Sequence, residues 1–299
     1  MVLSSSPSFS FNEWHGSVTI HGRAVLSHRR PFVQRIQDKD GSWISKALPK
    51  SYLFDVNFYL HDSDGRSADS IVGVGAYFDK AGINFTDEPG EFDIADISMQ
   101  ITLLSHQGLD EEVQSRLLPK EFDINQYSFV GTIHRMNWVG LVSEGHNVNC
   151  RPVLSIASIV ESVSEQPNED EEHTNVEIAL KSTPYVKILK DLDETGRFHP
   201  SCKIIATYPK FFKKPVKPAV GGYVSIEALG TSVSKDAQGH VSAIRVEIST
   251  VTFQGRPAKP DVKPPPPSTP SPAAPGKRNA SFNYADSPVP AKRSRIQRS

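Results

Sequence analysis

Apolar and polar residues alternate along most of the first 256 residues, with the period of two that is typical of half-buried β-strands. The segment from Tyr52 to Leu60 shows this pattern after Asp55 and is rich in aromatic and branched side chains. Turn residues such as Asp64-Gly65 and Glu88-Pro89-Gly90 separate the alternating segments. The predicted strands are 17–20, 23–26, 52–60, 71–78, 94–104, 127–138, 153–163, 176–180, 203–208, 223–229 and 241–253.

One segment, Leu109 to Leu118, has the features of a helix. Asp110-Glu111-Glu112 would occupy its first turn, where negative charge is favourable, and Pro119 would end it. A single short helix among many strands favours an all-β fold over an α/β fold. We therefore predict two small β-barrels of the OB-like, Greek-key kind.

The acidic run at 169–172 marks the predicted boundary between the barrels. Four consecutive carboxylates repel one another and gain nothing from burial, which predicts a solvated linker or loop. An alternative is that the second barrel opens at Tyr127, which would make the acidic run an internal loop. The predicted organisation is a flexible N-terminus (1–13), an acidic β-barrel domain (14–164), an acidic linker or loop (165–175), a basic OB-like β-domain (176–256) and a disordered tail (257–299).

The tail is rich in Pro, Ser and Ala and has few large apolar side chains, so it cannot bury enough surface to order itself. Its basic pairs Lys277-Arg278 and Lys292-Arg293 are separated by 13 residues, and Arg295 extends the second pair. This spacing matches a bipartite nuclear localisation signal, which a nuclear import receptor reads. We expect a nuclear location.

The net charge of −1 conceals an uneven distribution along the chain. Residues 1–172 carry 13 Lys and Arg against 25 Asp and Glu, whereas residues 173–256 carry 12 against 7 and residues 257–299 carry 8 against 2. A polyanion-binding surface is therefore expected in the C-terminal half. The alternative is that solvated faces simply differ in charge.

A basic and aromatic segment, from Tyr208 to Pro218, provides the candidate binding residues. Lysines neutralise phosphates and exposed rings stack on bases, which is the combination that single-stranded DNA or RNA requires. In the alternative interpretation, Phe211 and Phe212 fill the core while the lysines only solubilise a loop. The predicted nucleic-acid contacts are Lys210, Phe211, Phe212, Lys213, Lys214 and Lys217.

The stretch from Gly222 to Gly230, followed by Val241 to Phe253 with Gly255, resembles a block in uncharacterised proteins of mushroom-forming fungi. In that block an aromatic-Val-Ser strand precedes a strand that ends in Thr/Val-x-Phe-x-Gly. The resemblance covers about 50 residues of this chain, from about Ile204 to Gly255, and implies no known function. In architecture the block is similar to OB-fold modules of single-stranded nucleic-acid-binding proteins.

Catalytic motifs are absent from the sequence: Gly73-Val74-Gly75 lacks the third glycine of a phosphate-binding loop, and no Gly-x-Ser-x-Gly or His-Glu-x-x-His occurs. The two cysteines and the scattered histidines predict neither a metal site nor a cofactor, and no apolar run is long enough to span a membrane. We therefore predict a non-enzymatic nuclear protein that binds single-stranded nucleic acid. The alternatives are a nuclear scaffold that binds other proteins without nucleic acid, and an enzyme with a site of dispersed Asp and His residues.

Overall fold

The structure is a computed structural model of the 299-residue chain. All the described strands belong to one compact unit, residues 1–257. The structure describes residues 16–61, 68–79, 82–83, 85, 92–104, 117, 123–167, 174–184, 186, 188, 201–209, 212 and 215–255.

Most of the described residues lie in β-strands, which confirms the predicted all-β class. The strands are β1 (Ser17–Gln37), β2 (Trp43–His61), β3 (Ala68–Phe78), β4 (Asp93–Leu103), β5 (Phe129–Leu141), β6 (Val153–Pro167), β7 (Thr174–Ser182), β8 (Cys202–Thr207), β9 (Tyr223–Lys235) and β10 (Val241–Gly255). Every segment predicted as a strand lies in one of these or extends beyond it by at most two residues, and 17–20 and 23–26 both lie in β1. Two short 3-10 helices, η2 (Ile124–Gln126) and η3 (Val142–Glu144), flank β5.

The first five strands form a closed ring of hydrogen-bonded neighbours in the order β1-β2-β3-β5-β4 and back to β1. All pairs are antiparallel except β3 with β5, which are parallel. The bending of β1 closes the ring, because its first half pairs with β4 and its second half with β2. We call this the N-terminal ring.

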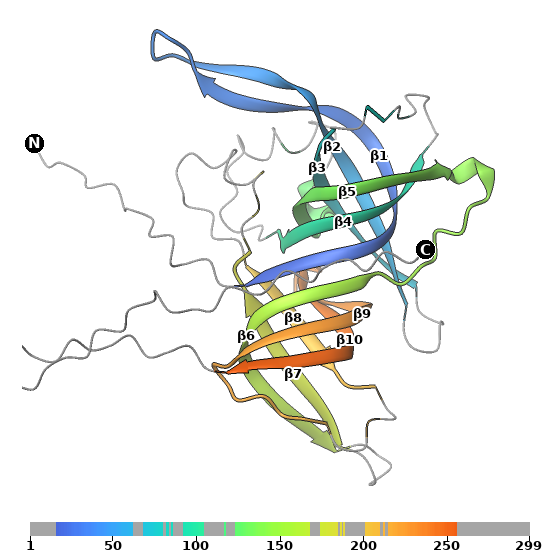
Figure 1. Cartoon of the computed structure of the whole chain (residues 1–299), viewed down its shortest axis with the longest axis vertical. Coiled ribbons are helices and arrows are strands. Elements are labelled where there is room, and N and C mark those ends of the chain that lie inside the picture. Colours follow the sequence, from blue (N-terminus) through green and yellow to red (C-terminus); the bar gives the residue numbers. More distant parts are fainter. Residues whose placement is uncertain are drawn as a thin grey trace, which may run out of the picture. The chain divides into compact units, whose positions relative to one another are not determined.

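The last five strands repeat the same arrangement in the order β6-β7-β8-β10-β9 and back to β6, with β8 and β10 parallel. We call this the C-terminal ring. Antiparallel pairing of β1 with β6, from Ser17↔Ala157 to His21↔Val153, joins the two rings. Figure 1 shows the resulting ladder of strands, in which β5, β4, β1, β6, β9 and β10 follow one another.

Alternate residues of each strand point into a buried core that includes the inner side chains of both rings. In β2 these are Phe54, Val56, Phe58 and Leu60. A second buried cluster covers part of the outer face of β2, β3 and β5, where Leu53 and Val74 pack with Leu117, Tyr127, Val186 and others. Part of the N-terminal ring's outer face is therefore covered by other segments of the chain.

Glycines allow β5 to approach both of its neighbours, β3 and β4, closely. A Cβ atom on Gly131 would lie 2.2 Å from the backbone oxygen of Gln100, and one on Gly73 would lie 2.3 Å from the ring of Phe129. The Gly73-Val74-Gly75 sequence therefore serves strand packing in β3. Any larger residue at Gly131 would require the backbone of β4 to move.

The ends of β1 and β2 extend beyond the N-terminal ring as a two-stranded hairpin, which Figure 1 shows in blue. Val33 pairs with Ala47 and Gln37 with Trp43, and the turn between them lies at 38–42. The sequence analysis did not predict these strand ends. This hairpin has solvent on both faces, as the exposed residues Lys39, Ile44 and Lys46 show. It therefore lacks the regular apolar alternation from which strands are predicted.

The acidic segment 165–175 includes the last residues of β6 and the first of β7. These two strands pair with each other, with Glu165 opposite Val176, so the segment connects neighbouring strands of the C-terminal ring. Tyr127 directly precedes β5, which belongs to the N-terminal ring. In strand pairing, the change from one ring to the next falls between β5 and β6.

The predicted helix at Leu109–Leu118 lies outside the described residues except for Leu117, which is helical. The predicted N-terminus (1–13) and tail (257–299) also lie outside them. In the part of the chain that is described, no helix has the length and apolar character needed to span a bilayer.

Candidate functional site

The predicted basic and aromatic segment lies between β8 and β9. The Phe212 side chain is 42% exposed and packs against the Tyr208 ring, with ring centroids 5.5 Å apart. The Tyr208 hydroxyl donates a 2.7 Å hydrogen bond to the Val216 carbonyl, which draws the two ends of this segment together. The Phe212 ring is thus partly exposed and packs against Tyr208, and it does not fill the core.

Lys217 is the only one of the predicted lysines in the described part of the chain, since Lys210, Phe211, Lys213 and Lys214 lie outside it. Its Nζ lies 2.7 Å from Glu165 Oε1, and both side chains are about half exposed. An exposed ion pair of this kind contributes little to stability and is easily exchanged for another partner. Lys217 can therefore still bind an anionic ligand if its ion pair with Glu165 breaks.

A hollow of about 580 Å³ opens on the C-terminal ring. We call it the C-terminal hollow. Its floor is the outer face of β7 and β8, and the turn from β9 to β10 forms one wall. The lining residues are Leu103, Leu104, Glu161, Lys181, Ser201, Lys203, Asp236, Gln238, His240, Val241 and Ser242.

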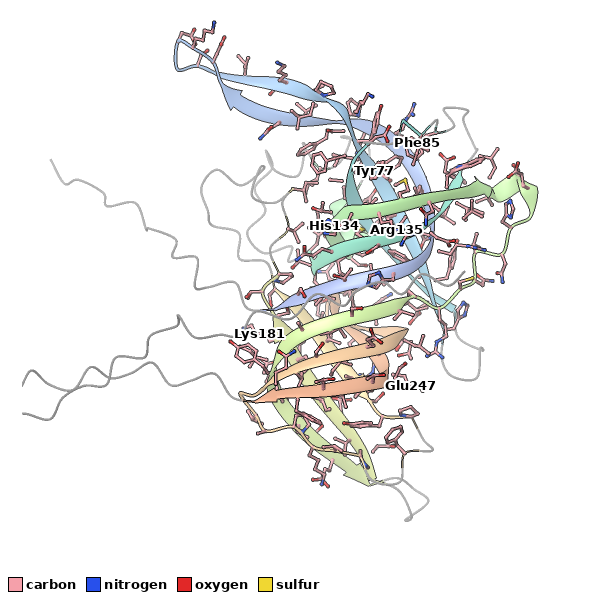
Figure 2. The ribbon with its side chains drawn as sticks, in the orientation of Figure 1. Tyr77, Phe85, His134, Arg135, Lys181 and Glu247 are labelled. Atoms are coloured by element: carbon pink, nitrogen blue, oxygen red, sulfur yellow. The ribbon has the colours of Figure 1, made fainter. Side chains whose placement is uncertain are left out.

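Lys181 and Lys203 lie directly opposite each other in the antiparallel pair of β7 and β8. Both are exposed, and neither has an ion pair or side-chain hydrogen bond within the described ranges. Figure 2 labels Lys181 on this ring. Like charges directly opposite each other on neighbouring strands repel, so this pair does not stabilise the sheet by itself. An anion in the hollow would relieve the repulsion.

The wall of the C-terminal hollow is a turn organised by Asp236. Its Oδ1 accepts hydrogen bonds from the backbone N–H groups of Gln238 and His240, both at 2.9 Å. Although local desolvation opposes ionisation, these bonds and nearby His240 hold the pKa of Asp236 below its usual range. The carboxylate is thus engaged within the turn. The charge of Glu161, in contrast, is exposed and faces any ligand of the hollow.

The N-terminal ring has its own hollow, of about 470 Å³, on the outer face of β1, β2 and β3. We call it the N-terminal hollow. At one side Asp55 is buried and accepts contacts from Arg30 Nη1 at 2.8 Å, His28 Nδ1 at 2.9 Å and the Tyr127 hydroxyl at 2.8 Å. Burial and the Asp55 charge raise the pKa of Tyr127, which keeps its hydroxyl protonated as a donor.

A bulge in β1 makes this arrangement possible. The register of β1 with β2 shifts between Ser27 and Arg30, and His28 takes a positive φ of 48°. The shift brings His28 and Arg30 to the side of the sheet on which Asp55 lies. Arg30 also donates to the carbonyl oxygens of His28 and Leu117, so each of its three nitrogens makes at least one hydrogen bond.

The two hollows occupy equivalent positions in the two rings. Each has its floor on the outer face of the second and third strands of its ring, and each includes residues of the connection between the fourth and fifth strands. Their chemistry differs, because the C-terminal hollow holds two lysines that have no ion-pair partner among the described residues, whereas the N-terminal hollow has aromatic and aliphatic walls. Sequence analysis missed Lys181 and Lys203. Lys203 lies in a predicted strand and Lys181 directly follows one, but the sequence does not show that the two residues pair.

Other candidate chemistry is limited among the residues described. No group of three or more His, Cys, Asp or Glu side chains there is placed to hold a metal ion. Cys202 is fully buried, and burial raises the pKa of its thiol to about 12, whereas Cys150 is only partly buried. The predicted localisation residues Lys277, Arg278, Lys292, Arg293 and Arg295 lie outside the described residues.

Comparison with known proteins gives no family assignment. No protein-family model matches the chain, and no curated protein matches it. Among solved structures the chain is similar to the wild-type single-stranded DNA binding protein from Thermus aquaticus, with a TM-score of 0.37 and 11% identity, over 84% of this chain and 100% of that chain. A deletion mutant of the same protein gives a TM-score of 0.39 and 10% identity over the same shares. These values are too low to establish a fold or a ligand.

Proposed function

We propose that this protein binds single-stranded nucleic acid without catalysis, and that each ring is a small OB-like, Greek-key barrel. The support for the barrel type is the strand order, in which the first strand is followed by the second, third, fifth and fourth and then the first again. The OB-fold is a five-stranded Greek-key barrel that binds oligonucleotides with its second and third strands and with two of its connecting loops. Both hollows lie on that part of their rings.

The observation that carries the proposal is the pair of unpaired lysines in the C-terminal hollow. Lys181 and Lys203 face each other across two strands and have no anionic partner within the described residues. A phosphate between them would be attracted by both charges and would release counterions from the nucleic acid. A single strand suits the site, since its flexible backbone can follow the open face of a sheet.

The segment between β8 and β9 supplies the second support. Phe212 presents part of its ring to solvent, as a stacking contact requires, and Lys217 lies on the same connection. The same segment also favours the alternative function, a nuclear scaffold that binds other proteins. Phe212, Val216 and Val220 are 42%, 53% and 57% exposed, and such apolar side chains also form protein interfaces.

Binding of a fluorescently labelled single strand by the full chain tests the proposal. We expect the affinity to fall steeply as salt rises, and Phe212→Ala to weaken it at least about fivefold, since stacking on a ring contributes about 1–3 kcal/mol. Phe253→Ala is the matched control, because Phe253 is 43% exposed on β10. A full chain that binds no single strand, or binds it independently of salt, would contradict the proposal and favour the scaffold.

The proposed site of action is the nucleus, reached through the bipartite signal in the tail. The double variant Lys292→Ala/Arg293→Ala should leave a fluorescent fusion of the full chain in the cytoplasm, because the import receptor needs both basic clusters. Lys259→Ala/Lys263→Ala removes the same charge outside the signal and should stay nuclear. If the first variant also stays nuclear, the tail is not the signal.

A further inference from the structure

The N-terminal hollow has the properties of a pocket for a flat, neutral ring. Its volume of about 470 Å³ lies in the range of about 300–1,000 Å³ that is usual for small-molecule sites. Tyr59, Val72, Phe92 and Val142 give it aromatic and aliphatic walls. Phe92 and Val142 are 37% and 38% exposed, and a 3.0 Å backbone hydrogen bond from Val142 to Phe92 holds these two residues together.

The charges around this hollow exclude an anionic ligand. None of the described residues that line it is a lysine or an arginine. Its carboxylate, Asp55, is neutralised by Arg30 and also contacts His28 and Tyr127. Arg30 does not line the hollow, and its three nitrogens donate to Asp55 and to two backbone carbonyls. The hollow suits a neutral ligand with polar groups on one edge.

Asn57 supplies a side-chain amide that can form hydrogen bonds with the polar edge of such a ligand. It lines the hollow, and its Oδ1 atom is buried without a hydrogen-bond partner among the described residues. A buried amide oxygen that lacks a donor destabilises the folded chain, and a ligand N–H group can remove that cost. A side-chain amide pairs in two bonds with adenine, by accepting from the exocyclic amino group and donating to the ring nitrogen N7.

We infer that the N-terminal hollow binds one nucleobase, preferably adenine, with the ring between its apolar walls and the polar edge on Asn57. The inference deepens the proposed function, because the C-terminal hollow would then hold phosphates while the N-terminal hollow selects a base. The adenine ring that binds there can belong to a free nucleoside or to a base within a bound strand. A phosphate-free nucleoside separates this pocket from the lysine site.

The experiment uses the full chain and follows chemical shifts or heat on titration with adenosine and with thymidine. We expect adenosine to bind about tenfold more tightly, since a two-bond contact to the correct base gives discrimination of that order. Asn57→Leu should remove this preference without lowering the unfolding midpoint, because leucine leaves no unsatisfied amide. A second arm compares an oligothymidylate strand with the same strand that carries one adenine.

A variant that fills the mouth of the hollow provides an independent check. Val142→Trp should block adenosine and remove the effect of the single adenine, and it should fold because Val142 is exposed at the surface. Val153→Trp is the matched control, since Val153 is 39% exposed on β6 and does not line the hollow. Adenosine binding without a strand effect supports the pocket with a free ligand, and a strand effect without adenosine binding supports it with a strand.

The inference is overturned if neither titration depends on Asn57 or on Val142. If strands bind but neither free adenosine nor the single adenine in a strand has an effect, this pocket fails while the proposed function stands. If adenosine binds and no single strand does, the proposed function fails while the pocket stands.

Discussion

Replacing Lys181 and Lys203 together by alanine is expected to weaken binding of a single strand by about thirtyfold at low salt. Each lysine that contacts a phosphate near the protein surface contributes about 1 kcal/mol, and about 1.4 kcal/mol corresponds to a factor of ten. The slope of log affinity against log salt should become shallower by about 0.7, because the two lysines share one phosphate and each phosphate contact to a single strand contributes about 0.7. Fluorescence anisotropy at several salt concentrations measures both quantities.

The same double variant should not lose stability. Like charges directly opposite each other on two strands cost about 0.2–1 kcal/mol, so the free energy of unfolding should stay constant or rise slightly. Lys39→Ala/Lys46→Ala removes the same charge from the projecting hairpin and separates a site effect from an effect of net charge. Glu161→Gln should strengthen binding, because it removes an anion from the hollow. If both double variants weaken binding equally, the lysine pair is not the phosphate site.

Asp55→Ala is expected to lower the free energy of unfolding by about 3–5 kcal/mol, which is the usual cost of removing one partner from a buried ion pair. Arg30, whose side chain is 14% exposed, would lose its carboxylate, and the buried Tyr127 hydroxyl would lose its acceptor. Urea unfolding followed by tyrosine and tryptophan fluorescence measures this loss.

Asp96→Ala provides the comparison for this prediction, because it also breaks an Arg–Asp pair. Arg23 Nε lies 3.0 Å from Asp96 Oδ1, but the Asp96 side chain is 48% exposed. A surface pair of this kind contributes about 0–1 kcal/mol. Equal losses for the two variants would show that the burial of Asp55 does not set its importance. The Asp55 variant should also disturb adenosine binding, since Asp55 holds one side of the N-terminal hollow.

The strands were predictable because their signal is local. In β9, inner and outer residues alternate from Tyr223 to Gly230, and this alternation reflects one buried and one solvated face. The hairpin end of β1 and β2 was missed for the opposite reason, since neither of its faces is buried against the ring. The acidic run at 169–172 lies outside the described residues, between the paired strands β6 and β7, and a linker and a turn between paired strands have the same local composition.

The candidate site was predictable only in part. The exposed Phe212 lies in a segment whose composition indicated binding, because mixed lysines and aromatic rings stand next to one another in the sequence. Lys181 and Lys203, in contrast, are separated by the whole connection from β7 to β8 and meet only through the register of these two strands. Asp55 likewise meets Arg30 and Tyr127 only because a bulge in β1 turns the sheet toward it.

By itself, the sequence determined the β-class, the approximate positions of the strands and the basic character of the C-terminal half, because alternation and charge are properties of neighbouring residues. The tertiary structure alone decided that the strands close into two rings of the same order, that two lysines face each other and that two hollows lie at equivalent places. The physical reason is that strand pairing depends on contacts between distant segments, whose register no local pattern records.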